Sequence, residues 1–208
     1  AFLAQQGPQR VVPDPRLSLN MPIYNQLIQH GFRRSGAHCY RPHCSNGHSG
    51  CEACIACRLA VNDFRPSRSQ RRCYKRNRAL TMSTVAAEFS DEYFELYRRY
   101  LNSRHIDGSM AYPAEDDFRQ FLYSEWSDTQ FLELRDNGRL IAVAVTDIVS
   151  DGISAVYSFF EPEMPERSLG TFCILTQIDQ EKEGSKPFNR GEEKQYLHDA
   201  NTPRAFNE

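Results

Sequence analysis

Five of the seven cysteines lie close together, with two histidines, in one stretch of the chain. The stretch is residues 39–58, CYRPHCSNGHSGCEACIACR. Zinc takes four ligands of these types, and thiolates also hold iron–sulfur clusters. The spacing favours a metal set of Cys44, Cys51, Cys54 and Cys57, with Cys39, His43 and His48 as alternative members. A group of reduced thiols without metal is the other interpretation, and spacing alone leaves both open.

A strongly basic segment follows directly. Residues 65–78, RPSRSQRRCYKRNR, contain seven arginines and lysines and no acid. Residues 31–78 hold 11 basic and 2 acidic residues, a charge of +9, whereas the remainder holds 14 basic and 25 acidic, a charge of −11. Such a local excess binds phosphates without reading sequence, and Tyr74 could stack on a base. The alternative is a solvated basic surface. We predict a nucleic-acid-binding face made of Arg65, Arg68, Arg71, Arg72, Lys75 and Arg76.

The helices and strands that must position these groups are predicted most clearly in the middle of the chain. Helical apolar periodicity runs through residues 91–101 and 113–122, with Ser90 as an N-cap and Pro113 in the first turn of the second helix. Hairpin signals at Asn137-Gly138 and Asp151-Gly152 separate strands expected at about 129–135, 139–148 and 153–160. Another helix is expected to begin at Ser168.

This order of elements predicts an α/β (α+β) fold. It resembles the acyltransferase fold of the GCN5-related N-acetyltransferase type, here with a Cys-rich basic N-terminal region. In that fold a strand leads into a glycine-bearing loop and a helix whose N-terminal N–H groups hold phosphate. Ser168 and Gly170 stand at the corresponding place, and we predict that they contact the nucleic acid. The alternative is an ordinary helix cap.

The chain of 208 residues suits one large domain or two small ones. We divide it into a Cys-rich basic region at 1–78, an acyltransferase-like domain at 79–180 and a polar tail at 181–208. No run approaches the roughly 18 apolar residues of a membrane span. The first residues lack the basic leader and long apolar core of a secretory signal, so we expect a cytoplasmic protein.

Several motifs together resemble one family, the bacterial aspartate/glutamate leucyltransferases, which are relatives of the arginyl-tRNA–protein transferases. The resemblance covers roughly residues 1–178 in order. Its motifs are GFRRSG (31–36), YRPHC (40–44), CEACIACR (51–58), VNDFRPSRSQRR (61–72), RYLNSRHIDGSM (99–110) and DGISAVYSFFEPEMPERSLGTFCILTQI (151–178).

The resemblance implies an aminoacyltransferase of the N-end rule degradation pathway. Such an enzyme moves leucine, or in the arginyl relatives arginine, from aminoacyl-tRNA to the N-terminal Asp or Glu of an acceptor protein. The partners it implies are aminoacyl-tRNA and these acceptor proteins, and we expect neither a membrane nor DNA as a partner. The aminoacyl ester is already activated, so the chemistry requires no cofactor. A zinc ion or an iron–sulfur cluster is expected only as a structural group.

The reaction implied by this resemblance suggests roles for particular residues. An acidic acceptor needs a fixed cation, for which arginine is suited by its bidentate geometry, and the candidates are Arg33, Arg34 and Arg41. Tyr157 is the candidate hydroxyl at the reacting centre, and His105 is a candidate proton relay. Tyr157, Phe159 and Leu169 are candidates for a leucine pocket, although core packing is the alternative for all three.

The chain also departs from the family pattern. The family carries a cysteine element at a position that falls immediately before Ala1. After Ile178 the family's next strand and its tyrosine-rich element are not recognisable, so we expect the sheet to lack a strand and expose an edge. Two other function classes remain open: an N-acetyltransferase that uses acetyl-CoA, and a metal-stabilised RNA-binding module without activity.

Overall fold

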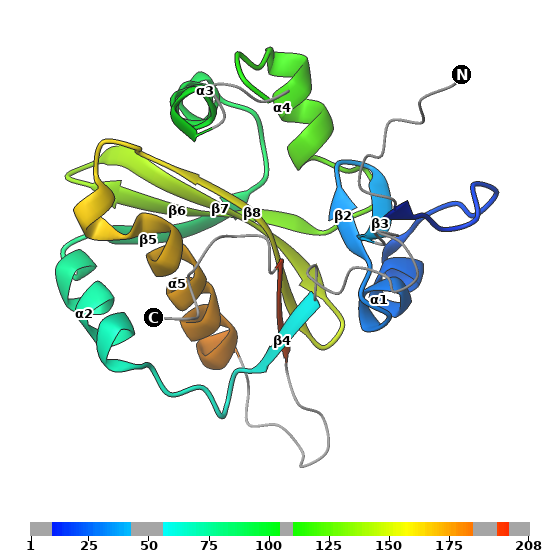
Figure 1. Ribbon diagram of the computed structural model, residues 1–208, viewed down its shortest axis with the longest axis horizontal. Helices are drawn as coiled ribbons and strands as arrows, with labels where there is room; N and C mark the ends of the chain where they lie inside the picture. Colours follow the sequence, from blue (N-terminus) through cyan, green and yellow to red (C-terminus); the bar gives the residue numbers. More distant parts are fainter. Residues whose placement is uncertain (1–9, 43–55, 105–109, 185–194, 200–208) are drawn as a thin grey trace, which may run out of the picture.

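A mixed sheet of six strands forms the centre of the protein. The computed structural model describes residues 10–42, 56–104, 110–184 and 195–199. Its strands lie in the order β4-β9-β8-β7-β6-β5, and every neighbouring pair is antiparallel except β8 and β9 (Figure 1). Their bounds are β4 Ala56–Ala60, β5 Thr81–Ala86, β6 Thr129–Asp136, β7 Arg139–Val149, β8 Gly152–Phe160 and β9 Gln195–Asp199.

The three central strands confirm the pattern expected from the two turn signals. At the first turn Asn137 and Gly138 both have positive φ, 49° and 86°, as the tight hairpin requires. Strand β7 is buried along almost all of its length because helices cover both faces of the sheet. The predicted α/β class, with three antiparallel strands followed by a helix, is therefore confirmed.

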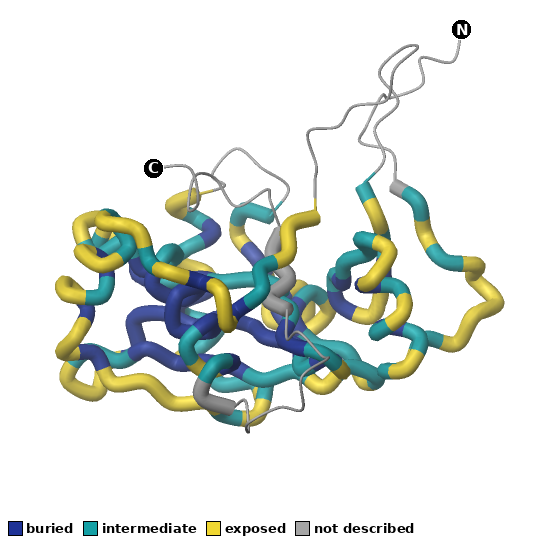
Figure 2. The backbone as a smooth tube through the Cα atoms, turned by 90° about the horizontal axis from the view of Figure 1, so that it is seen from below, coloured by how far each residue is buried: buried dark blue, intermediate teal, exposed yellow. Residues whose placement is uncertain are grey.

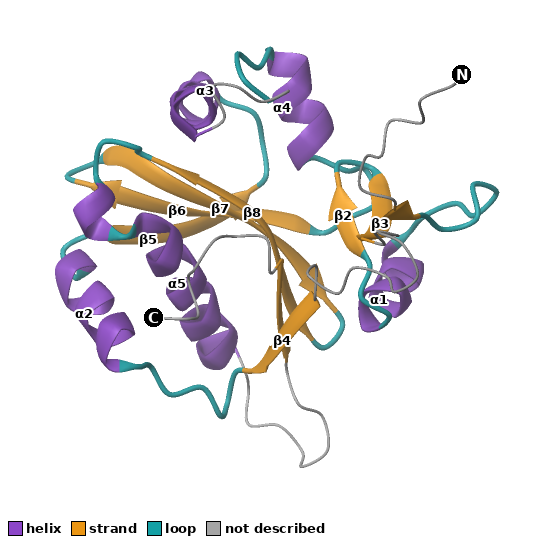
Figure 3. Cartoon of the chain, viewed as in Figure 1, coloured by secondary structure: helices purple, strands orange, loops and turns teal. Residues whose placement is uncertain are grey.

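Two helices pack on each face of the sheet (Figures 1 and 3). Helices α2 (Arg68–Asn77) and α5 (Leu169–Gly184) cover one face, and α3 (Asp91–Arg104) and α4 (Glu115–Leu122) cover the other. The first core combines residues of α2 and α5 with Leu132, Leu134 and Ile141 of the sheet. The second combines residues of α3 and α4 with Phe131, Val143 and Phe159. Figure 2 shows the buried residues gathered in the interior, with exposed residues around the outside.

The helix starts follow local capping chemistry. Ser90 Oγ accepts a hydrogen bond from the Tyr93 N–H at 3.2 Å, as expected for an N-cap. Ser67 and Gln70 form a capping box at the start of α2. The prediction of Pro113 in the first turn was wrong: α4 begins at Glu115, after the N-cap Ala114, so Pro113 lies two residues before the helix.

The N-terminal residues form a small sheet of their own. Strands β1 (Arg10–Val11), β3 (His38–Pro42) and β2 (Arg33–Ser35) pair antiparallel, and α1 (Met21–Gln29) packs beside them. Its core of Tyr24, Ile28 and Cys39 meets Val149 of β7. The region before residue 78 is nevertheless not separate from the rest, because β4 lies in the six-stranded sheet and α2 covers that sheet.

The expected gap after residue 178 is not present. Helix α5 continues to Gly184, and β9 pairs parallel with β8 and antiparallel with β4. The sequence QYLHD therefore fills the edge that was predicted to be exposed. Within the described residues, no helix has both the length and the apolar character to cross a membrane.

Candidate functional site

A cavity of about 290 Å³ lies where the N-terminal sheet meets β8 and β4. Its lining combines apolar side chains with arginine and hydroxyl groups. Members of the N-terminal sheet and α1 are Ile28, Gly31, Phe32, Arg33, Arg34, Ser35 and Tyr40; the others are Ala56, Cys57, Met110, Phe121, Ser154, Ala155, Val156 and Tyr157. A concave, mostly apolar site with a few polar groups is typical of a binding site for a small organic group.

A bulge in β8 interrupts the pairing of its backbone N–H and C=O groups at this cavity. Val145 pairs with Tyr157 and Thr146 pairs with Ala155, so Val156 is an extra residue without a partner on β7. Strand β9 pairs with β8 only as far as Ala155, so among the described residues Val156 has no strand partner on that side either. Such bulges are frequent next to active sites, because they redirect backbone and side chains. In the part of the chain that the structure describes, the edge of β8 after Ala155 is therefore open along the cavity.

Tyr157, the predicted hydroxyl at the reacting centre, lines this cavity directly after the bulge. Its ring makes an edge contact with Phe121, with 4.9 Å between centroids, and further contacts with Tyr97 and Tyr100. Burial raises the pKa of Tyr157, so the phenol is protonated at neutral pH and can donate a hydrogen bond. Among the described residues, no group is hydrogen-bonded to its hydroxyl. This hydroxyl is thus a donor available to a bound molecule.

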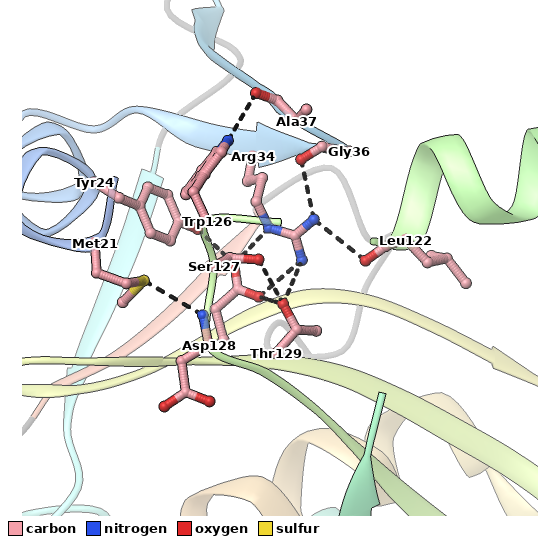
Figure 4. Close-up of polar contacts among 11 residues, drawn as sticks. Met21, Tyr24, Arg34, Gly36, Ala37, Leu122, Trp126, Ser127, Asp128 and Thr129 are labelled. Carbon is pink, nitrogen blue, oxygen red and sulfur yellow. Dashed lines mark hydrogen bonds and ion pairs between the residues drawn. The ribbon is translucent and has the colours of Figure 1, made fainter. Parts of the chain in front are cut away.

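Arg34 does not fit the role of acceptor ligand that the sequence suggested, because its whole guanidinium is bonded inside the protein (Figure 4). Nε and Nη2 donate to the two carboxylate oxygens of Asp147, at 2.7 and 2.8 Å. Nη1 donates to the carbonyls of Gly36 and Leu122, and Nη2 also donates to the Thr129 hydroxyl. All five N–H groups therefore have partners, and neither side chain of the pair is exposed.

The buried pair connects the N-terminal sheet to β7. Asp147 accepts two more hydrogen bonds, from the Tyr24 hydroxyl of α1 at 2.9 Å and from the Thr129 hydroxyl at 2.7 Å. Successive residues of a strand point to opposite faces, so fixing Arg34 inward turns Arg33 and Ser35 the other way. Both of these line the cavity. Arg34 thus acts structurally and determines where its neighbour Arg33 lies.

Of the other predicted acceptor ligands, Arg33 lies in the cavity wall and Arg41 lies outside it. The Arg41 guanidinium sits over the Phe32 ring at 5.5 Å from its centroid, and Nη1 donates to the His30 carbonyl at 3.3 Å. Phe32 itself lines the cavity. Arg41 therefore borders the site behind an aromatic wall, and Arg33 is the arginine best placed to meet a bound carboxylate.

The predicted leucine pocket was wrong for two of its three members. Phe159 is fully buried in the core under α3 and α4, whereas Leu169 belongs to the core under α2 and α5. These cores lie on opposite faces of the sheet, so the two side chains cannot line one pocket. The apolar lining found in the structure is Ile28, Phe32, Met110, Phe121 and Val156, none of which was singled out from the sequence.

Helix α2, together with Arg65 just before it, presents the predicted basic residues to solvent. Arg65, Arg68, Arg71, Arg72, Lys75 and Arg76 are all exposed, and a shallow groove lies along Ser69, Arg72, Lys75 and Arg76. Tyr74 does not face outward: its ring packs against Phe172 and its hydroxyl donates to the Leu175 carbonyl. The expected base-stacking role of Tyr74 is therefore not supported, and the face is electrostatic.

Buried contacts hold this basic face against the start of α5. Asn77 donates to the Arg167 carbonyl at 2.8 Å, and the thiol of Cys73 lies against the Ser168 carbonyl at 3.7 Å. Arg76 Nη2 in turn donates to Ser168 Oγ at 3.1 Å. Ser168 has a left-handed backbone, φ 53°. The two groups predicted to bind nucleic acid, on α2 and at the α5 N-terminus, are thus adjacent.

Gly170 is needed for packing. A Cβ added there would lie 2.9 Å from Cε1 of Phe160, so a larger residue must displace that ring. Phe160 also contacts Tyr100 of α3, with ring centroids 4.8 Å apart, and the Arg104 guanidinium over its face. The open edge of β8 therefore runs from the bulge at Val156 to Phe160, between α3 and the start of α5.

Part of the predicted site lies outside the described residues: His105 and three of the proposed metal ligands, Cys44, Cys51 and Cys54. The fourth, Cys57, is exposed on β4 and lines the cavity. Cys39 is a poor candidate ligand, because it is buried in the N-terminal core and burial raises its thiol pKa to about 12. Metal binding requires the thiolate.

Comparison with known proteins matches nearly the whole chain to one family. The family described as "Arginine-tRNA-protein transferase, N terminus" matches residues 2–72, and the one described as "Arginine-tRNA-protein transferase, C terminus" matches residues 92–198. Among curated proteins, the aspartate/glutamate leucyltransferase of Alcanivorax borkumensis is 47% identical over 86% of this chain and 73% of its own length. The enzyme of the same name from Teredinibacter turnerae is 45% identical over 90% of this chain and 76% of its own.

Solved structures give weaker similarities. A structure of L-PGS from Bacillus licheniformis aligns with 86% of this chain and 49% of its own, at a TM-score of 0.48 and 12% identity. The ribosomal-protein-S18-alanine N-acetyltransferase from Escherichia coli aligns with 50% of this chain and 61% of its own, at a TM-score of 0.36 and 19% identity. These scores are too low to support statements about substrates.

Proposed function

The chain belongs to the arginine-tRNA-protein transferase family, and from that premise we propose that it transfers leucine from leucyl-tRNA to proteins with an N-terminal Asp or Glu. The observation that supports this most is the cavity at the β8 bulge, which combines a donor hydroxyl, an arginine and an apolar lining. Leucyl-tRNA is cytoplasmic, so the cytoplasm is the proposed location.

The donor's path follows from charge and shape. In this proposal the tRNA backbone lies on the exposed arginines of α2, and the α5 N-terminus with Ser168 holds a phosphate near the 3′ end. The 3′ end then follows the open edge of β8 from Phe160 to the bulge. That edge is about 13 Å long, since it spans four residue steps of roughly 3.3 Å each. The leucine side chain would enter the apolar lining, beside Phe32 and Val156.

The chemistry needs little beyond positioning. The α-amine nitrogen of the acceptor attacks the carbonyl carbon of the leucyl ester, the bond to the ribose oxygen breaks, and the amine's proton ends on the released ribose hydroxyl. The product is a peptide bond and free tRNA. An unperturbed α-amine has a pKa of about 7.7–8.0, so a useful fraction is neutral at pH 7. Holding amine and ester together contributes several kcal/mol.

The cavity offers hydrogen-bond donors for the negative charge that develops in the reaction and a cation for the acceptor's carboxylate. The Tyr157 hydroxyl and the backbone N–H groups at the Val156 bulge can donate to the carbonyl oxygen as it becomes an oxyanion. Arg33 meets the acceptor's side-chain carboxylate in a charge-assisted hydrogen bond. Selectivity for Asp and Glu then follows, because only an acidic side chain brings the negative charge that makes this hydrogen bond to the guanidinium charge-assisted.

A metal at the cysteine-rich segment remains part of the proposal as a structural group. Cys57 on β4 has the exposure that a ligand needs, and it would act with Cys44, Cys51 and Cys54. Metal analysis of protein purified without oxygen would test this: close to one zinc, or iron with labile sulfide, per chain is the expected result.

One transfer assay separates the function classes. Leucyl-tRNA with labelled leucine is mixed with peptides that begin with Asp, Glu or Ala, and a parallel reaction contains labelled acetyl-CoA. We expect label from leucyl-tRNA on the Asp and Glu peptides only. Acetylated peptide would instead identify an N-acetyltransferase. Bound tRNA that keeps its leucine with every peptide would identify a binding module.

A further inference from the structure

A second cavity, of about 470 Å³, adjoins the first on the side away from β4 and lies between the β2–β3 hairpin and helix α4. The two cavities share Ser35, Met110 and Phe121 in their linings. The second adds groups that can hydrogen-bond a peptide, among them His38, Asp117 and Gln120, all of which are exposed. Because the linings overlap, a chain that enters one cavity can continue into the other.

The walls of this second cavity are rigidly joined. Gly36, at the tip of the hairpin, donates its N–H to the Phe121 carbonyl at 2.8 Å. Its φ is +56°, and a Cβ there would lie 1.8 Å from the Gln120 carbonyl oxygen, so only glycine permits this contact. Trp126 Nε1 also donates to the Ala37 carbonyl at 3.2 Å. The groove is therefore formed in the unbound protein.

An exposed aromatic residue stands at the rim of the groove. The Tyr112 ring is 74% exposed, and its neighbours Ala111 and Pro113 line the cavity. Its backbone is left-handed, φ 56°, and is held by a hydrogen bond from its N–H to the Asn102 side chain at 2.9 Å. Backbone strain of this kind is concentrated at functional sites, and here it places an exposed aromatic residue at the rim of the groove.

We propose that this groove binds the second to fourth residues of the acceptor protein as an extended chain. The inference rests on the proposed function, which requires the acceptor's first residue in the first cavity. The donor occupies the edge of β8, so the acceptor chain must leave by another side, and the adjoining groove gives that exit. A stretch of about 10 Å holds three extended residues.

The charge of the groove predicts which residues it accepts. The N-terminal turn of α4 carries Glu115, Asp116 and Asp117, all exposed, and Asp117 lines the groove. Asp117 also holds the helix start, because its Oδ2 accepts from the Ala114 N–H at 2.8 Å. Basic residues at acceptor positions two to four are therefore favoured over acidic ones. The protein thus selects acceptors that have an acidic first residue and disfavours acidic residues at the acceptor positions directly after it.

The test measures leucine transfer to acceptors of increasing length: aspartyl amide, then Asp peptides of two, three, four and six residues. We expect kcat/KM to rise about ten-fold by the fourth residue and then to level off. A further pair of pentapeptides carries Lys or Glu at positions two and three. Wild-type protein is expected to prefer the Lys peptide two- to five-fold, the range of an exposed charge pair.

Two variants assign these effects to the groove. Asp117→Asn keeps an oxygen for the helix cap and is expected to remove most of the Lys preference, whereas Asp116→Asn, the same change one residue away and outside the groove lining, should leave it in place. Tyr112→Ala should reduce the advantage of longer acceptors. Transfer that does not depend on length, or a Lys preference unchanged in Asp117→Asn, overturns the groove assignment alone. Failure with every acceptor, short and long, overturns the proposed function as well.

Discussion

Removing the carboxylate of Asp147 is expected to destabilise the protein strongly. Asp147 accepts four hydrogen bonds, two from the buried Arg34, one from the buried Tyr24 and one from the half-buried Thr129. In Asp147→Ala the guanidinium stays buried without its counter-charge, a loss that costs about 3–5 kcal/mol. That is a large share of the roughly 5–15 kcal/mol of a typical domain. For a chain of this size the melting temperature should fall by about 10 °C.

Urea unfolding followed by tryptophan fluorescence measures this change. Trp126 is the single tryptophan of the chain, and its ring contacts Tyr24 with 5.1 Å between centroids, so it reports on the affected region. The matched control is Glu95→Ala, which breaks the exposed pair with Arg98, where the side chains are 46% and 49% exposed. That change should cost about 0.5 kcal/mol or less.

A paired substitution separates loss of charge balance from loss of packing. In Arg34→Met with Asp147→Leu neither charge remains, so this double variant should be more stable than Asp147→Ala. If Asp147→Ala costs less than about 1 kcal/mol, the guanidinium is solvated in solution and the buried pair does not anchor the N-terminal sheet. A double variant less stable than the single one would show that packing, and not charge, dominates.

Three further predictions follow from other parts of the structure. Arg72→Ala or Arg76→Ala on α2 should weaken tRNA binding and lower the slope of log K against log salt by about 0.7–0.9 each, while Arg98→Ala on α3 should leave the slope unchanged. Hydrogen bonds from Arg135 lower the pKa of Glu92 and Glu133, so the stability that these carboxylates contribute is present above about pH 4.5 and is lost as the pH falls further. In Arg135→Gln the melting temperature should therefore depend less on pH between pH 5 and 3. The same pH dependence in variant and wild type would exclude this contribution of Arg135. Burial raises the thiol pKa of Cys39 and Cys173 to about 12, so iodoacetamide at pH 8 should label the exposed Cys57 and spare these two in protein from which a chelator has removed bound metal, as peptide mass spectrometry would show.

The central strands could be predicted because their signals are local. The Asn-Gly and Asp-Gly turns and the apolar runs between them fix β6, β7 and β8 to within a residue or two. The bulge at Val156 could not be predicted in the same way, because it is a property of the pairing between two strands. The same is true of β9, whose short polar sequence becomes a strand only between β4 and β8.

Among the site residues, Arg33 and Arg34 show what the sequence could have added. Adjacent residues of a strand face opposite ways, so one of the pair had to point inward once residues 33–35 were recognised as a strand. Its partner, Asp147, lies within the apolar run of β7, where an acid signals a buried ion pair. The apolar cavity lining comes from five separate segments, and only the tertiary structure brings these together.

The most direct test of the account is single-turnover transfer by Arg33→Ala, measured with tRNA binding in the same preparation. Leucyl-tRNA is presented with otherwise identical peptides that begin with Asp or Asn. We expect transfer to the Asp peptide to fall about 10- to 100-fold, which corresponds to the loss of one charge-assisted hydrogen bond, with tRNA affinity retained. The preference for Asp over Asn should disappear. A variant that keeps wild-type transfer and still prefers Asp would contradict the assignment of this cavity as the transfer site.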